Sequence, residues 1–98
     1  MIHIIVHHKV ADYGKWKEVF DSHLNPRLAG GEVGSRVFQS VDDPRHITVL
    51  SDWDSLENAR RFMTSEVLRT AMKNAGVIGD PEIHYVQDAV LVRRTSAD

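Results

Sequence analysis

Histidine is the residue type in this sequence best suited to proton transfer near neutral pH, because its ordinary pKa is about 6.5. The six histidines are His3, His7, His8, His23, His46 and His84. A histidine in a pocket of aromatic side chains can accept or donate a proton for a bound small molecule. Two tryptophans and three phenylalanines are available to form such a pocket. The fold must therefore decide which histidines lie near aromatic residues.

Metal and thiol chemistry find no support in the sequence. Cysteine is absent, which excludes thiolate nucleophiles, zinc–thiolate sites and cysteine-bound iron–sulfur clusters. His3 and His7 lie four residues apart on a predicted strand, about 13 Å at roughly 3.3 Å per residue, so they are too far apart to bind one metal. No HExxH or comparable spacing occurs. We therefore predict no metal and no cofactor.

The strands that position these residues follow from alternation of apolar and polar side chains. Four segments show it, namely residues 2–10, 32–41, 46–53 and 82–92. His8 shares the strongly apolar face of the first segment. Trp53 ends the third segment on its apolar face. The residues from Gly79 to Pro81 are typical of a turn that leads into the last strand.

A first helix is predicted between the first two strands. Asp12 is placed to cap a helix that opens at Tyr13. Trp16 and Phe20 lie on its apolar stripe, one turn apart. Pro26 should end or kink the helix, because proline disfavours the helical conformation in the residue before it.

A second helix is predicted between the third and fourth strands. Ser55 is a good N-cap, and Phe62 lies on the apolar face that follows it. Thr64 and Ser65 interrupt the pattern, and Ser65 can cap a further helical segment. The residues from Asn74 to Gly76 are typical of a helix end.

The element order βαββαβ predicts a ferredoxin-like α+β fold. Right-handed crossovers place both helices on one face of a four-stranded antiparallel sheet. The expected strand order is four, one, three, two, with the first and third strands parallel at the centre. A chain of 98 residues fits one domain, so we expect a single domain over residues 1–98.

This topology predicts one apolar pocket between the helices and the sheet. With strands one and three parallel, Trp53 would end beside His8. His84, near the start of an antiparallel fourth strand, would lie at the same end. We therefore predict His8 and His84 as catalytic residues and four aromatic residues as the ligand-binding wall, namely Trp16, Phe20, Trp53 and Phe62. The alternative is that these aromatic residues form plain core.

Charge limits the partners of the chain. The net charge is −2 with neutral histidines, whereas nucleic-acid binding usually requires a basic face. Lysine and arginine form pairs such as Arg60-Arg61, but no larger cluster that would suit an anionic membrane surface. We predict neither a nucleic-acid nor a membrane partner. The lack of cysteine is compatible with the cytosol, which is the expected compartment.

A homodimer is predicted from the sheet face that the helices leave uncovered. This face should carry His3, Ile5 and His7, together with Phe38 and Leu50. It is too apolar to remain fully exposed and too polar for a monomer core. A second copy related by a twofold axis would present the same patch and cover it. A monomer with a partly solvated sheet is the alternative.

The sequence resembles the dimeric α/β-barrel proteins related to antibiotic biosynthesis monooxygenases over residues 2–90. The resemblance lies in a histidine-bearing first strand and in the segments DYGKWKEVF, SRVFQSVDDP, ITVLSDWDSLENARRF and AMKNAGVIGDPEIHYV. It implies the ferredoxin-like fold and a counterpart, Trp53, of a tryptophan near the end of the third strand. Haem-degrading members use an asparagine on the first strand and a histidine on the second helix. This sequence has neither, so haem chemistry is not expected.

The resemblance implies activities that range from cofactor-free oxygenases and cyclases to proteins without known chemistry, and a fold does not choose among them. Our first hypothesis is a cofactor-free monooxygenase-like or cyclase-like enzyme for a small aromatic or polyketide-like substrate. The second is a non-catalytic dimeric protein that binds a small ligand or serves as an accessory. The third is a structural or interaction protein whose aromatic residues are all core.

Overall fold

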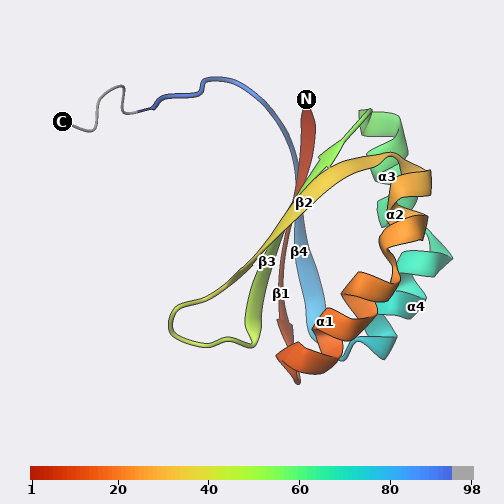
Figure 1. Ribbon diagram of the computed structural model, residues 1–98, viewed down its shortest axis with the longest axis vertical. Coiled ribbons are helices and arrows are strands. Elements are labelled where there is room, and N and C mark those ends of the chain that lie inside the picture. The colour runs from red at the N-terminus through yellow and green to blue at the C-terminus, as the bar shows by residue number, and fades with distance from the viewer. Residues whose placement is uncertain (94–98) are drawn as a thin grey trace.

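The computed structural model describes residues 1–93 and places four helices on one face of a four-stranded sheet (Figure 1). Residues 94–98 of the predicted domain lie outside the described residues. Both predicted helical stretches are divided into two helices, and the predicted ferredoxin-like α+β class is confirmed. The elements are β1 (Ile2–Val10), α1 (Tyr13–Ser22), α2 (Leu24–Gly30), β2 (Glu32–Gln39), β3 (His46–Trp53), α3 (Leu56–Met63), α4 (Glu66–Asn74) and β4 (Val77–Gln87).

The order of strands in the sheet is β2-β3-β1-β4, as predicted. However, β1 runs antiparallel to both β3 and β4, so the prediction that β1 and β3 are parallel was wrong. The helical crossover brings β2 back in the same direction as β1. The short connection between β2 and β3 then reverses the chain, so β3 runs antiparallel to both. In the resulting register, Trp53 pairs with Ile2 and Ile47 pairs with His8. Trp53 and His8 therefore lie at opposite ends of the central strand pair.

The first helical stretch begins and breaks where its capping residues require. The Asp12 carboxylate accepts a hydrogen bond from the backbone N–H of Gly14 at 2.9 Å. The stretch is interrupted at His23, because Pro26, in the first turn of α2, has no N–H to donate to the preceding turn. Gly31 ends α2 with φ 116°, a left-handed conformation that other residues rarely adopt.

The second helical stretch has the two predicted caps. The Ser55 hydroxyl accepts a hydrogen bond from the backbone N–H of Asn58 at 3.1 Å. The Ser65 hydroxyl accepts one from the N–H of Leu68 at 3.2 Å and thereby starts α4. Each cap satisfies a backbone donor that the first helical turn leaves without an intrahelical acceptor.

The last strand differs from its predicted range. β4 covers residues 77–87 rather than 82–92, and β2 ends at residue 39 rather than 41. The stretch from Gly79 to Pro81 lies inside β4, where the pairing with β1 shifts register between His7 and Lys9. Gly79 has φ 73°, which suits a β-bulge. The glycine and proline therefore mark a bulge and not a turn.

The core lies between the sheet and the helices. Ile4, Val10 and Ile47 are fully buried there, and β1 alternates between buried and more exposed residues as predicted. The opposite sheet face has no helix over it in the described part of the chain (Figure 1). Within residues 1–93, no helix has both the length and the apolar character needed to cross a membrane.

Candidate functional site

A cavity of about 90 Å³ lies between the sheet and the helices and opens to the surface. Most of its lining is apolar and comes from β1, β3, α1, α3 and α4. The helix α2 contributes only the charged residue Arg27. The polar or charged lining residues are His8, His23, Arg27, Glu32 and Ser51. An apolar concave surface with a few polar groups is the usual form of a small-molecule site.

His8 is the polar group at one end of the cavity. It lies on β1 with 6% of its surface exposed, and neither ring nitrogen has a hydrogen-bond partner within residues 1–93. Burial, with a smaller contribution from the charge of the neighbouring His7, lowers the pKa of His8 to about 4, since apolar surroundings disfavour the charged ring. Near pH 7 His8 is therefore a neutral imidazole that can offer one N–H and one lone pair to a bound molecule.

An aromatic wall on α1 extends from His8 along the cavity. The ring centroids of His8 and Trp16 are 5.7 Å apart. Trp16 and Phe20 stack with their centroids 4.9 Å apart and their planes inclined by 17°. The guanidinium of Arg27 lies 3.8 Å from the centroid of the Phe20 ring. These contacts form a continuous aromatic lining along α1, in which Trp16 and Phe20 cover one face of each other.

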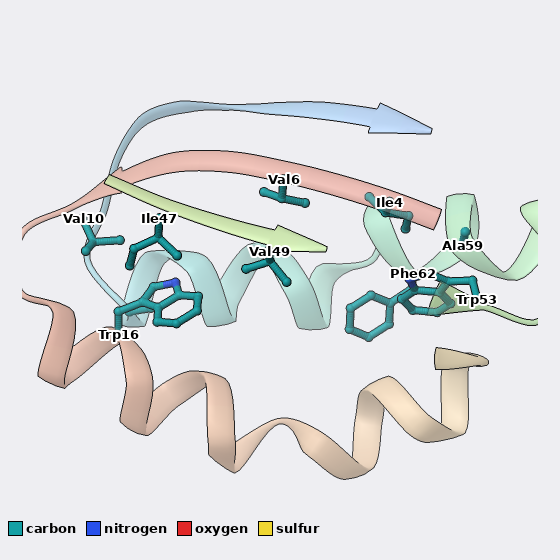
Figure 2. Close-up of a cluster of buried hydrophobic side chains, with 10 residues drawn as sticks. Ile4, Val6, Val10, Trp16, Ile47, Val49, Trp53, Ala59 and Phe62 are labelled. Carbon is teal, nitrogen blue, oxygen red and sulfur yellow. The ribbon is translucent and has the colours of Figure 1, made fainter. Parts of the chain in front are cut away.

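A second aromatic pair closes the other end of the cavity. Trp53 and Phe62 have ring centroids 5.4 Å apart. The indole Nε1–H of Trp53 donates to the Ser51 hydroxyl at 2.8 Å, so its donor is already used inside the protein. Figure 2 shows Trp53 and Phe62 beside Ile4, far along the core from Trp16.

The structure brings five of the six predicted site residues to this cavity, but not in the predicted grouping. His8, Trp16, Phe20, Trp53 and Phe62 all line it. The prediction had placed Trp53 next to His8, and this was wrong because β1 and β3 are antiparallel. His8 and Trp16 therefore form one end of the cavity, and Trp53 and Phe62 form the other.

His84 lies outside the cavity, contrary to its predicted place. It pairs with Ile5, whose side chain is on the open face of the sheet. The His84 side chain is 54% exposed and its Nε2 lies 2.9 Å from a carboxylate oxygen of Glu82. The pairing register of β4 with β1 decides which β4 side chains point toward the helices. The sequence of β4 did not show this, because both sides of the strand carry apolar residues.

A buried ion pair that sequence reasoning missed lies on the cavity wall. Arg27 Nε is 2.8 Å from Glu32 Oε2, and the two side chains are 11% and 2% exposed. The Nε–H does not point directly along this contact, but the opposite charge of Arg27 and side-chain hydrogen bonds from Ser35 and Arg27 stabilise the carboxylate. Burial raises the pKa of the Glu32 carboxyl, and the charge of Arg27 opposes this effect without cancelling it.

Glu32 escaped prediction because of an irregularity at the start of β2. Simple alternation places Glu32 on the same face as Gly34 and Phe38, which is the open face. The pairing of β2 with β3 shifts register between Glu32 and Gly34, and this bulge turns Glu32 to the helix side, opposite Trp53. The only signal in the sequence was an acidic residue directly after Gly31, which ends the helix. Such a residue is typical of an exposed position, so it did not indicate a buried carboxylate.

Nδ1 and Nε2 of His8 are buried at this cavity and have no polar partner in the described part of the chain. Arg27 Nε and Glu32 Oε2 also lack a well-directed hydrogen bond, but they are paired with each other at 2.8 Å. Buried polar groups are nearly always hydrogen-bonded in folded proteins, so each exception requires an explanation. A ligand bound in the cavity would give the His8 ring a partner, which makes the cavity the best candidate for a functional site.

Comparison with solved structures identifies the fold. A Bordetella bronchiseptica protein provisionally named as an antibiotic biosynthesis monooxygenase has a TM-score of 0.78 and 18% identity, over 91% of this chain and 97% of that one. SnoaB, a cofactor-independent oxygenase from Streptomyces nogalater, has a TM-score of 0.75 and 11% identity, over 95% and 97%. No family model and no curated protein matches the chain. The chain therefore shares the fold of structures described as antibiotic biosynthesis monooxygenases, as the resemblance in its sequence implied.

Proposed function

We propose that the chain is a cofactor-free, monooxygenase-like enzyme that oxidises a small, flat aromatic substrate in the helix–sheet cavity. The observation that carries this proposal is His8, a buried neutral imidazole beside Trp16 whose ring nitrogens have no partner within residues 1–93. The description of SnoaB as a cofactor-independent oxygenase supports the choice of reaction through the shared fold.

The role proposed for His8 is that of general base. His8 accepts the hydroxyl proton of a bound phenol, and the aryloxide that forms beside it favours the charged imidazolium. The electron-rich aryloxide then reacts with dioxygen, which is the oxidant. For a naphthol, the C–OH and one ring C–H become the two carbonyls of a quinone. One oxygen atom enters the product, and the other leaves as water with the two hydrogens that the substrate has lost.

The aromatic residues are proposed to hold and shield this substrate. Trp16 and Phe20 present stacked rings on one wall, and Trp53 with Phe62 closes the far end. Exclusion of water by such walls strengthens the electrostatic effect of His8 on a developing negative charge.

A non-catalytic ligand-binding protein is the second candidate for the same cavity. It is favoured by the pKa of His8, which burial lowers to about 4 and which makes the ring a weak base while the cavity is empty. A cyclase-like enzyme would also use His8 as a base, but its reaction would consume no dioxygen.

Oxygen uptake with 1-naphthol, measured together with ligand-induced thermal stabilisation, separates these candidates. We expect wild-type protein to consume dioxygen, His8→Gln to lose this activity, and His84→Gln, which alters an exposed histidine outside the cavity, to retain it. Stabilisation by naphthol without oxygen uptake would favour the binding protein. Absence of both effects would overturn the enzyme and the binding protein alike.

We also propose that the open sheet face packs against a second copy of the chain. This face exposes Phe38 by 42% and Val86 by 38%. Beyond β4, the residues from Val90 to Val92 are between 78% and 85% exposed, and they pair with no strand within residues 1–93. A second copy related by a twofold axis would cover the open sheet face and the apolar residues beyond β4 with the same surfaces of its own.

Light scattering after size-exclusion chromatography tests the dimer. We expect twice the chain mass of 11.1 kDa for the wild type and a monomer for Phe38→Glu, because a charge would then lie in the apolar interface. Val67→Glu is the matched control, since Val67 is similarly exposed but lies on α4. A wild-type monomer at micromolar concentration would overturn the dimer. The cytosol stays the compartment predicted from the sequence.

A further inference from the structure

The open space of the cavity depends on two small residues of α4. Ala71 and Ala75 line the cavity, lie one helical turn apart and are only 7% and 4% exposed. Every other apolar residue in the lining is valine or larger. Protein interiors are normally packed without gaps of this kind. The two alanines therefore leave a space that the surrounding side chains do not fill.

Ala75 lies at the end of the cavity that contains His8. The backbone N–H of Ala11, which directly follows β1, donates to the carbonyl of Gly76 at 3.0 Å, and this bond holds the C-terminal end of α4 beside the end of β1. His8 lines the same cavity and has two buried ring nitrogens without a hydrogen-bond partner within residues 1–93. A void that is only a packing defect is lined by apolar groups. The unpartnered imidazole therefore indicates that the space beside the alanines takes a ligand.

The mouth of the cavity lies between α1 and α4, which run side by side over the sheet (Figure 1). Among the lining residues, Phe20 on α1 and Leu68 and Met72 on α4 are only half-buried, whereas His8 and Ala71 are buried. A ligand whose hydroxyl reaches His8 therefore directs its other end between these two helices.

The volume of the cavity limits what can lie beside His8. This volume is about 90 Å³, whereas an apolar cavity that holds one benzene molecule measures about 150 Å³. A single ring therefore fills the interior and extends into the mouth, and no room is left for further rings on both of its sides. A polycyclic ligand fits only when the ring that carries its hydroxyl is at the end of the fused system.

We propose that Ala71 and Ala75 determine the specificity of the cavity by admitting a terminal hydroxyl-bearing ring and excluding a hydroxyl-bearing ring that is fused on both sides. The hydroxyl of the admitted ring lies at His8, and the remaining rings lie in the mouth. The inference rests on the proposed function, because it concerns the ligand of the same cavity. It goes beyond that function by naming the shape of the ligand and the two residues that select it.

Two isomers test this selection on the wild-type protein, with affinities measured by calorimetry or tryptophan quenching. The hydroxyl is on a terminal ring in 2-phenanthrol and on the central ring in 9-phenanthrol, so the isomers have the same atoms and nearly the same apolar area. We expect 2-phenanthrol to bind about tenfold or more tightly than 9-phenanthrol. Equal affinity, tighter binding of 9-phenanthrol, or failure of both where 1-naphthol binds would overturn the inference and leave the proposed function intact. Absence of binding by all three would overturn both.

Variants of Ala71 assign the selection to α4. Ala71→Leu places three more carbon atoms in the cavity and should weaken the binding of 2-phenanthrol and 1-naphthol about tenfold or more. Ala71→Gly removes the Cβ and should reduce the preference for 2-phenanthrol over its isomer about threefold or more. Ala29→Leu is the matched control, since Ala29 is an exposed alanine of α2 that does not line the cavity, and it should bind as the wild type does.

Circular dichroism of each variant shows whether it is folded. Wild-type affinity in a folded Ala71→Leu variant would overturn the assignment to α4. The comparison of the two isomers decides the selection even if a variant fails to fold, because it uses the wild-type protein alone.

Discussion

The buried imidazole of His8 should make the stability of this protein sensitive to acid. Burial lowers the pKa of His8 from 6.5 to about 4 in the folded chain, whereas in the unfolded chain the ring has its ordinary pKa. Between these two values the unfolded state binds a proton that the native state does not bind. The free energy of unfolding should therefore be fully retained above pH 6.5, fall as the pH decreases through this window, and level off below about pH 4.

The magnitude follows from the size of the pKa shift. One pKa unit corresponds to about 1.36 kcal/mol, so the lowering of the His8 pKa predicts a loss of about 3 kcal/mol between pH 7 and pH 4. This is a large part of the roughly 5–15 kcal/mol by which small domains are stable. His8→Leu removes the titrating group and also two ring nitrogens that are unbonded within residues 1–93. The variant should therefore be at least as stable as the wild type at pH 7 and clearly more stable at pH 4.

Urea denaturation followed by tryptophan fluorescence, at several pH values from 7 to 4, measures this difference. Carboxyl groups whose pKa the fold lowers, Asp43, Glu82 and Asp88, also cost stability in acid. His3, whose pKa is raised by hydrogen bonds to Asp88 and Asp52, acts in the opposite direction. These groups are present in both proteins, so the difference between wild type and variant isolates His8.

His7→Gln is the control for this experiment. Burial is the main cause of the lowered pKa of His8, and the charge of His7 is a smaller one. Removal of His7 should therefore leave most of the acid sensitivity in place. If His8→Leu loses as much stability between pH 7 and pH 4 as the wild type does, His8 is solvated or hydrogen-bonded in solution. The reasoning that makes it a free polar group in an apolar cavity would then fail.

Three further predictions concern other parts of the fold. Burial raises the pKa of Glu32 above its ordinary value of 4.5, so the native state binds a proton that the unfolded state releases, and the wild type loses stability as the pH rises. The Glu32→Gln variant does not titrate. In urea titrations from pH 4 to pH 8, its unfolding free energy should therefore increase relative to that of the wild type. Ser55→Ala should lower the unfolding free energy by about 1 kcal/mol, because it removes the N-cap of α3; an unchanged denaturation midpoint would contradict this role. Gly31→Ala should lower the melting temperature more than Gly79→Ala, although both positions have positive φ. A Cβ at Gly31 would lie 2.5 Å from Asp54 Oδ1, whereas a Cβ at Gly79 would have no atom of the described chain within 4 Å. Equal melting temperatures would show that the neighbour moves freely.

Local signals in the sequence predicted most of the secondary structure. The range of β3 was predicted at residues 46–53 as observed, because an alternating segment lies between a turn and an N-cap. The caps Asp12, Ser55 and Ser65 were also predicted correctly. The signals at these sites come from residues within a few positions along the chain, and the physical interactions are equally local.

Pairing between strands decided what the sequence did not. Alternation shows which residues of a strand share a face, but it does not show the direction of the neighbouring strand or its register. The prediction therefore placed Trp53 next to His8, although Trp53 lines the opposite end of the cavity. It also placed His84 in the cavity, although His84 lies on the open face of the sheet. The start of β4 was missed because Gly79 and Pro81 can signal either a turn or a bulge, and only pairing with β1 distinguishes these.

By itself, the sequence determined the class of fold, the element order, the capped helices and the aromatic stripe of α1 with Trp16 and Phe20. Those features depend on periodicity and on neighbours along the chain. Only the tertiary structure decided that the cavity has two distinct polar ends, with His8 at one and Arg27 beside Glu32 at the other. The physical reason is a register shift at the start of β2, which turns an acidic residue toward the core and cannot be seen without the strand that it pairs with.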